Sequence, residues 1–240
     1  MTMQVGMVGN NGVLLASDML WQNTDSNQYS DSRDTNFATK IERDYKRGIA
    51  IACARNMELA SRIAKDLLCE MGEDDWNESE RAVTIANRAL EGAREHRRNF
   101  QCTIISTKQQ RKIVKLYAIQ GSLHKTQWQS CYPTVFAGDA TNTAKFWSER
   151  YYSSWSESLR PIDELIPLAA HLIFSAGKVG PSIIGELEIF LCDSSGLRHL
   201  SEESIRELKS SVSELDKQFG EQIFGHRATL IWDKKDDRVA

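Results

Sequence analysis

The 240-residue sequence predicts an α+β protein with two antiparallel sheets and helical layers on their outer faces. Strand-like runs come in clusters of four, four and two, and helices separate the clusters. Each of the first two helical patterns has a single apolar stripe, which is typical of a helix that covers one face of a sheet. Strands that alternated singly with helices would instead indicate a parallel sheet.

The chain opens with a hairpin pattern. Residues 3–8 and 13–16 are apolar runs, and Asn10-Asn11-Gly12 lies between them. We expect these turn residues to supply the positive φ angles of a tight hairpin. The first two strands are therefore predicted to be antiparallel neighbours.

A polar segment separates this hairpin from a second strand pair. Residues 21–39 are rich in Asn, Asp, Ser and Gln, and we predict a long loop there. Residues 40–43 and 48–54 then form two strands around a charged turn. Asn56 is predicted to cap a helix that extends to about Met71, and Ser79 a second helix.

The later elements follow from the same patterns. We predict strands at 101–106, 112–120, 123–129 and 132–137, helices at 141–152 and 161–174, a strand pair within 186–200, and a helix over 201–219. The length fits a single domain spanning 1–240, in which residues 220–240 are a C-terminal extension.

Composition argues against several classes of protein. Lys plus Arg is 30 and Asp plus Glu is 33, so the net charge of −3 predicts no binding to nucleic acid or to a membrane. The five cysteines and five histidines have no metal-ligand spacing, so no metal or cofactor is expected. We expect mostly buried, reduced thiols, a cytoplasmic location and no secretory signal.

Thr2 is the candidate nucleophile. A threonine hydroxyl is a weak nucleophile and needs a base within hydrogen-bonding reach. If Met1 is removed, the α-amino group of Thr2, with a pKa of about 7.7–8.0 against about 10.4 for lysine, can take up the proton. Thr2 then supplies both the nucleophile and the base.

Two charged residues are predicted to support this amine. Asp18 ends the hairpin partner of the Thr2 strand, so strand pairing returns it to the side of Thr2. Lys40 opens the third strand and supplies an ammonium, which Asp18 holds in place. The N–H groups near Cys53 and Ala54 are candidates to stabilise the oxyanion.

The segments that carry these residues resemble the start of a proteasome β-type subunit. They are "TMQVGMVGNNGVLLASD", "KIERDYKRGIAIACA" and "NMELASRIAKDLL". Among bacterial proteasome homologues, the chain looks most like the betaproteobacterial proteasome homologue, and the order of elements agrees over roughly 2–200. The resemblance implies an N-terminal nucleophile hydrolase fold, a four-layer αββα sandwich, in a homo-oligomer of two stacked seven-membered rings. It also implies that Thr2 is nucleophile and base, tuned by Asp18 and Lys40.

The sequence departs from the family pattern at two places. The family's Gly-Ser-Gly motif appears here as Gly138-Asp139-Ala140, which makes Asp139 a fourth catalytic candidate. The later pair of an aspartate followed by serine and glycine has no clean counterpart, and its nearest candidates are Ser175, Lys178 and Ser182. Exposed-looking aromatics favour association of subunits; they are Trp147, Tyr151, Tyr152 and Trp155.

The leading hypothesis is a self-compartmentalising threonine peptidase that cleaves peptides or unfolded polypeptides through an acyl-ester on Thr2. A non-catalytic ring scaffold is the first alternative, and an amidase acting on a small amide is the second. Taken one at a time, the residues also have plain interpretations. Thr2 is then incidental, Asp18 caps a turn, and Lys40 is a solvated strand end.

Overall fold

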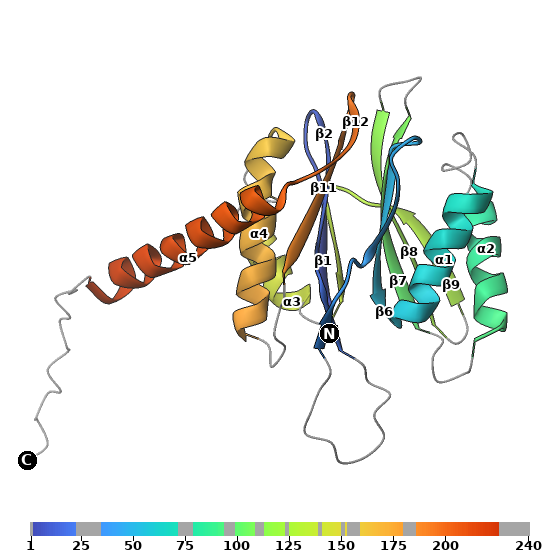
Figure 1. Cartoon of the computed structure of the whole chain (residues 1–240), viewed down its shortest axis with the longest axis horizontal. Coiled ribbons are helices and arrows are strands. Elements are labelled where there is room, and N and C mark those ends of the chain that lie inside the picture. The colour runs from blue at the N-terminus through green and yellow to red at the C-terminus, as the bar shows by residue number, and fades with distance from the viewer. Residues whose placement is uncertain are drawn as a thin grey trace, which may run out of the picture.

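Two five-stranded antiparallel sheets lie face to face between layers of helices in the computed structural model (Figure 1). The predicted αββα arrangement of two antiparallel sheets is confirmed. The structure describes residues 2–22, 35–71, 79–93, 99–108, 113–122, 125–138, 141–149, 152, 159–179 and 186–225.

The first sheet has the strand order β10-β1-β2-β11-β12. Its strands are β1 (Met3–Val8), β2 (Gly12–Asp18), β10 (Thr134–Gly138), β11 (Leu187–Asp193) and β12 (Gly196–His199). β1 and β2 pair in the register Gln4 to Ser17 and Val8 to Val13, as the hairpin pattern predicts. β1 is therefore an interior strand, held by β10 on one side and β2 on the other.

The second sheet has the order β5-β6-β7-β8-β9, in which each strand pairs with the next in the chain. Its strands are β5 (Ile41–Asp44), β6 (Ile49–Arg55), β7 (Phe100–Lys108), β8 (Ile113–Ser122) and β9 (Lys125–Ser130). Each lies within a few residues of its predicted range.

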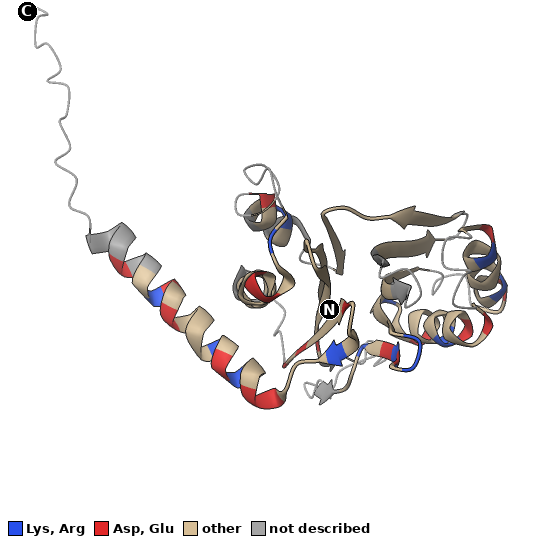
Figure 2. Cartoon of the chain, turned by 90° about the horizontal axis from the view of Figure 1, so that it is seen from above, with Lys and Arg blue, Asp and Glu red and all other residues tan. Residues whose placement is uncertain are grey.

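The described helices are α1 (Met57–Glu70), α2 (Ser79–Glu91), α3 (Thr141–Ser148), α4 (Ile162–Val179) and α5 (Glu202–Gly225). The first four cover the outer faces of the two sheets (Figures 1 and 2). Asn56 caps α1 as predicted, since its side chain accepts a hydrogen bond from the Leu59 N–H at 3.0 Å. α1 and α2 lie on the second sheet, and α3 and α4 on the first.

The turn between β1 and β2 differs from the predicted one. Asn10, Asn11 and Gly12 have no positive φ angle, although the turn is tight and the Gly9 N–H donates a hydrogen bond to the Gly12 carbonyl at 2.8 Å. The Asn11 side chain instead accepts a hydrogen bond from the N–H of Ile162, the first residue of α4, at 2.8 Å. The turn therefore docks the start of that helix.

The predicted loop at 21–39 contains some regular structure. β3 (Leu20–Gln22) and β4 (Thr35–Phe37) form a two-stranded antiparallel ribbon at its ends, and the intervening residues lie outside the described part. The polar composition does not reveal this pairing, because each strand is only three residues long. The ribbon brings the chain back from Asp18 to Lys40.

The interior between the sheets is apolar over most of its length. Its inward-facing residues include Val13, Leu15, Ile105, Leu116 and Phe190, all at most 1% exposed. Small residues of β6 face them, so the sheets approach closely. Four of the five cysteines are buried, and all are free, as predicted; Cys69 is exposed.

Tyr152 corrects one prediction about the aromatic residues. It is only 3% exposed, and its hydroxyl donates a hydrogen bond to the Val8 carbonyl, so it belongs to the core and not to an exposed patch. The side chain of Trp147, and Tyr151 and Trp155 altogether, lie outside the described part of the chain.

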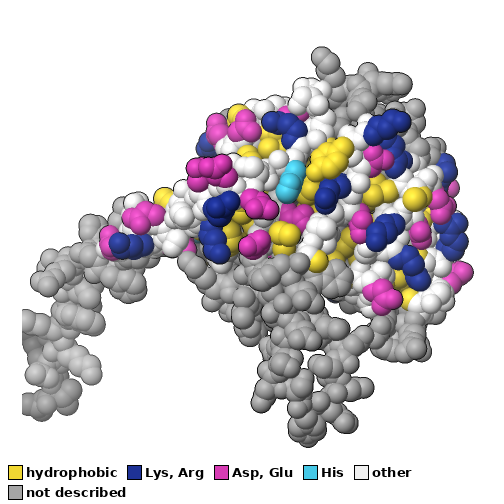
Figure 3. All heavy atoms as spheres, viewed as in Figure 1, with side chains coloured by type: hydrophobic (Ala, Val, Ile, Leu, Met, Phe, Trp, Pro, Cys, Tyr) yellow, Lys and Arg dark blue, Asp and Glu magenta, His cyan; other side chains and the backbone are white. Residues whose placement is uncertain are grey.

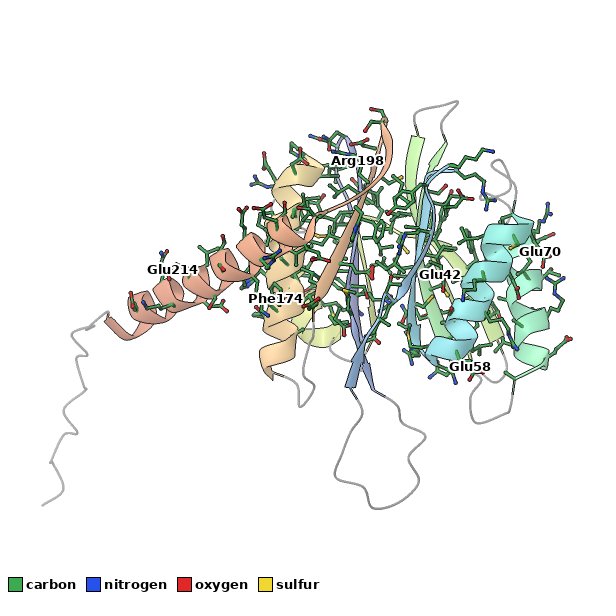
Figure 4. The ribbon with its side chains drawn as sticks, viewed as in Figure 1. Glu42, Glu58, Glu70, Phe174, Arg198 and Glu214 are labelled. Atoms are coloured by element: carbon green, nitrogen blue, oxygen red, sulfur yellow. The ribbon has the colours of Figure 1, made fainter. Side chains whose placement is uncertain are left out.

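α5 packs on α4 at its beginning and then leaves the body of the protein (Figures 1 and 2). Val212 is 3% exposed against the cluster that includes Phe174 of α4 (Figure 4), whereas Leu215 is 55% exposed. The helix continues to Gly225 instead of ending near Phe219. The predicted extension at 220–240 is thus helical at its start, and residues 226–240 lie outside the described part.

Charges of both signs are interspersed over the face shown in Figure 3. Among the described residues, no helix combines the length and the apolar character needed to cross a bilayer.

Substitution of Gly12 by alanine is expected to destabilise the fold by about 1–3 kcal/mol, as other overpacked sites do. A Cβ atom at Gly12 would lie 2.6 Å from the Cys192 carbonyl oxygen, which belongs to a central strand and cannot move freely. The measurement is the free energy of unfolding in urea. Gly92→Ala is the control, because its Cβ would meet nothing nearer than 3.8 Å. Equal stability of the two variants would contradict this account.

Candidate active site

Thr2 lies directly before β1 and is 7% exposed. Gly138, the last residue of β10, pairs with Met3 and has a φ angle of +105°. A Cβ atom at Gly138 would lie 1.7 Å from the carbonyl oxygen of Thr2. Only glycine permits this backbone conformation together with this close approach, so Gly138 allows β10 to hold Thr2 in place.

The structure brings Thr2, Asp18 and Lys40 together. The Lys40 ammonium lies 3.1 Å from the Thr2 hydroxyl oxygen and 2.8 Å from Oδ2 of Asp18. Asp18 is 1% exposed and Lys40 is 2% exposed. A buried ammonium and a buried carboxylate are tolerated only when they are paired, so each of these residues requires the other.

Asp18 also holds the backbone beside Thr2. Its Oδ1 accepts a hydrogen bond from the N–H of Met3 at 2.8 Å, while Oδ2 binds Lys40. The pairing of Gln4 with Ser17 places Met3 opposite Asp18, which is why the hairpin register predicts their proximity. One carboxylate thus orients both the ammonium and the peptide that follows Thr2.

Lys40 comes from the opposite sheet. It directly precedes β5, and its carbonyl accepts a hydrogen bond from the Cys53 N–H of β6 at 2.8 Å. Its backbone therefore belongs to the second sheet, whereas its ammonium binds residues of the first. Its side chain spans the gap between the sheets at the end where Thr2 lies.

A buried polar layer surrounds this cluster. On the first sheet, Gln4, Ser17 and Glu188 are neighbours in register, and Gln101 and Thr103 lie on β7 of the second sheet. Among the described residues, Oε1 of Gln4, Oγ1 of Thr103 and Oε1 of Glu188 have no hydrogen-bond partner. Sequence reasoning missed these residues. The available signal was a polar residue inside an otherwise apolar strand, as in "MQVGMV" and "LEIFLCD".

Glu188 is 4% exposed. Burial raises the pKa of its carboxyl group, and the hydrogen bond from Thr39 and the charge of Arg43 partly oppose that shift. The cost of burying this carboxylate indicates that it has a role in the arrangement around it.

Cys53 does not fit its predicted role. Its N–H is already bonded to the Lys40 carbonyl, so it is not an oxyanion donor, and Ala54 lies opposite Gln101 within the ladder of β6 and β7. A hydrogen bond with Cys102 and burial raise the pKa of the Cys53 thiol well above its usual value. Because the thiolate is the reactive form, Cys53 is also a poor nucleophile.

Of the remaining predicted candidates, Ser175 is the one whose side chain lies in the described part of the chain. Asp139 and Ser182 lie outside it, as does the side chain of Lys178. The Ser175 hydroxyl lies 3.4 Å from both ring nitrogens of His171, one turn earlier on α4. An oxygen equally distant from both nitrogens is not aligned with either, so this pair lacks the geometry of an activated serine. No group of His, Cys, Asp or Glu in the described residues is arranged to hold a metal ion.

Comparison with known proteins places the fold. No protein-family model matches this sequence, and no curated protein matches it. Among solved structures, the chain is similar to Anbu (ancestral beta-subunit) from Yersinia bercovieri, with a TM-score of 0.71. The fold is proteasome-like. The match covers 95% of this chain and 99% of Anbu at 14% sequence identity, a level at which the likeness concerns the fold alone.

Replacement of Lys40 by methionine is expected to destabilise the protein by roughly 3–5 kcal/mol, because it leaves the Asp18 carboxylate buried and unpaired. Urea unfolding at neutral pH measures this loss. The double variant Asp18→Asn/Lys40→Met is expected to recover part of the stability, since it buries no charge. Arg160→Ala, which breaks the exposed pair with Glu164, is the control and should cost less than about 1 kcal/mol. A loss no larger than this control would contradict the ion-pair account.

Glu188→Gln is expected to gain stability relative to the wild type as the pH rises from about 4 to about 8. Because the folded pKa of Glu188 is raised above the unfolded value of about 4.3, the folded wild type binds the proton more tightly than the unfolded chain does. The stability of the wild type therefore falls as the pH rises through the folded pKa, and glutamine has no such dependence. The measurement is the difference in unfolding free energy at several pH values. A difference that is constant with pH would contradict the raised pKa.

Proposed function

We propose that this chain is an N-terminal threonine hydrolase that cleaves amide bonds of peptides or unfolded polypeptides. The contact that carries the proposal is the buried one between the Lys40 ammonium and the Thr2 hydroxyl, at 3.1 Å, with Asp18 holding the lysine. A hydroxyl beside a fixed, buried ammonium favours the alkoxide, which is the reactive form of threonine.

The reaction begins when removal of Met1 exposes the α-amino group of Thr2. That amine takes the proton of the Thr2 hydroxyl, and Oγ1 attacks the carbonyl carbon of the substrate amide. The proton then passes to the leaving amine as the carbon–nitrogen bond breaks, which leaves an ester on Thr2. Water attacks the ester, releases the acyl half and restores the hydroxyl.

The other residues act on this nucleophile without bonding to the substrate. Lys40 stabilises negative charge on Oγ1, and Asp18 keeps the ammonium and the Met3 N–H in position. Gly138 lets β10 approach Thr2 closely enough to restrain it. Asp139 follows Gly138 directly, and we assign it a supporting role toward the amine.

We extend the proposal to assembly. A proteasome-like fold and exposed aromatics on the body, Tyr132 and Phe146, support a homo-oligomer, for which we propose two stacked seven-membered rings. We likewise propose a cytoplasmic protein of the betaproteobacterial homologue type, on the sequence motifs that carry that resemblance.

Hydrolysis of fluorogenic peptides is expected from the purified protein, together with loss of Met1 in the intact mass. Thr2→Ala should abolish turnover, because it removes Oγ1. Thr84→Ala, which removes an exposed hydroxyl on α2, is the matched control and should retain full activity. Hydrolysis by Thr2→Ala, or by protein that retains Met1, would refute the proposal.

Two further measurements on the same purified protein separate the alternative functions. A covalent adduct at Thr2 with an epoxyketone supports the hydrolase, whereas assembled rings without an adduct indicate the non-catalytic scaffold. Cleavage of a small amide but of no peptide indicates the amidase. A sedimenting species of only 27.2 kDa would remove the ring proposal.

A further inference from the structure

Glu188 binds the segment that carries Lys40. Its Oε2 accepts a hydrogen bond from the Thr39 hydroxyl at 2.9 Å, and its carboxylate also accepts one from the Lys40 backbone N–H. The Thr39 hydroxyl oxygen accepts the Ile41 N–H at 3.2 Å in turn. Thr39 and Lys40, which directly precede β5, are thus tied to β11, a strand of the other sheet.

The backbone of Lys40 is consequently held from both sheets. Its carbonyl bonds to the Cys53 N–H in the second sheet, and its N–H bonds to Glu188 in the first. β5 is a short edge strand that begins at Ile41, so Lys40 lies directly before it. A lysine side chain has four flexible carbon–carbon bonds, so the place of its ammonium depends on where its backbone is held.

The charges around Glu188 match this arrangement. Positive charge faces it from the β5 segment, through Lys40 and Arg43. The Arg43 guanidinium lies 5.7 Å from the ring centre of Phe190, two residues after Glu188 on the same face of β11. The carboxylate of Asp18, on the neighbouring strand β2, is occupied by Lys40 and Met3. Glu188 therefore faces cations and N–H or O–H donors of the β5 segment.

We propose that Glu188 is a positioning residue that sets the place of the Lys40 ammonium relative to the Thr2 hydroxyl. It does not touch the reacting atoms, and it acts through the hydrogen bonds to Thr39 and to the Lys40 backbone. The expected effect of Glu188 on activity rests on the proposed function. Its expected effect on the position of the Lys40 ammonium does not.

Three variants at one end of β11 test the inference. Glu188→Leu removes the carboxylate that accepts these hydrogen bonds and keeps a side chain of similar size. A displacement of about 1 Å at the reacting group is enough to lower kcat about 100-fold. We expect such a loss in kcat with little change in KM, because the substrate contacts stay in place. Glu188→Gln keeps an oxygen that accepts the same bonds and should retain most of kcat. Glu186→Gln, an exposed glutamate two residues earlier, is the control.

Thr39→Val is the second test, and it decides the matter if Glu188→Leu does not fold. It removes one of the two hydrogen bonds to Glu188, so we expect a several-fold loss in kcat at unchanged KM. The Thr39→Val/Glu188→Leu double variant should lose no more than Glu188→Leu alone, because both changes break the same link. Wild-type kcat in Thr39→Val, or additive losses in the double variant, would overturn the proposal.

A crystal structure of Glu188→Leu separates this inference from the proposed function. We expect the contact of 3.1 Å between the Lys40 ammonium and the Thr2 hydroxyl to be lost while the rest of the fold is unchanged. If the wild type shows no hydrolysis, the proposed function fails and this structure alone tests Glu188. A Lys40 that keeps its place in Glu188→Leu overturns the inference in either case.

Discussion

The buried ion pair between Lys40 and Asp18 is the constraint on which the rest of the site depends. The two charges come from different sheets and meet with almost no exposure to water, so neither can be moved or lost without leaving the other unpaired. The pair is also what turns the first residues of the chain into a fixed structure. Its carboxylate holds the Met3 N–H and its ammonium holds the Thr2 hydroxyl, so a segment that would ordinarily fray is bound from both sides.

The interior of the sandwich divides into two parts with different physical roles. Most of it is an apolar layer in which residues such as Leu15 and Phe190 are buried, and this layer stabilises the sheet pair. At the Thr2 end the same inward-facing positions carry Gln4, Ser17 and Glu188. Three buried oxygens there lack a hydrogen-bond partner among the described residues, which costs stability. A loss of stability that is confined to one end of the core is typical of a functional site.

The proteasome-like fold persists at 14% identity because few of its requirements concern particular residues. The outer helices need only an apolar stripe, and the inner strands need only small or branched apolar residues that let the sheets approach. Gly138 is an exception, since its positive φ and its approach to Thr2 exclude every other side chain. Function is not guaranteed by such a fold, and it depends on the few residues at the end of the sandwich.

The sequence by itself determined the order of the elements and the link between Thr2 and Asp18. Both are local properties: periodicity defines each strand and helix, and a hairpin of fixed register returns Asp18 to Met3. Lys40 was a candidate because it opens a predicted strand, but its contact with Thr2 could not be derived from the sequence, since a ribbon that composition does not reveal lies between Asp18 and Lys40. Glu188 is a polar residue inside an apolar strand, but its partner could not be identified from the sequence, since Thr39 is 149 residues away. Tertiary structure decided these pairings, because residues so distant in the chain become neighbours only when the two sheets pack together.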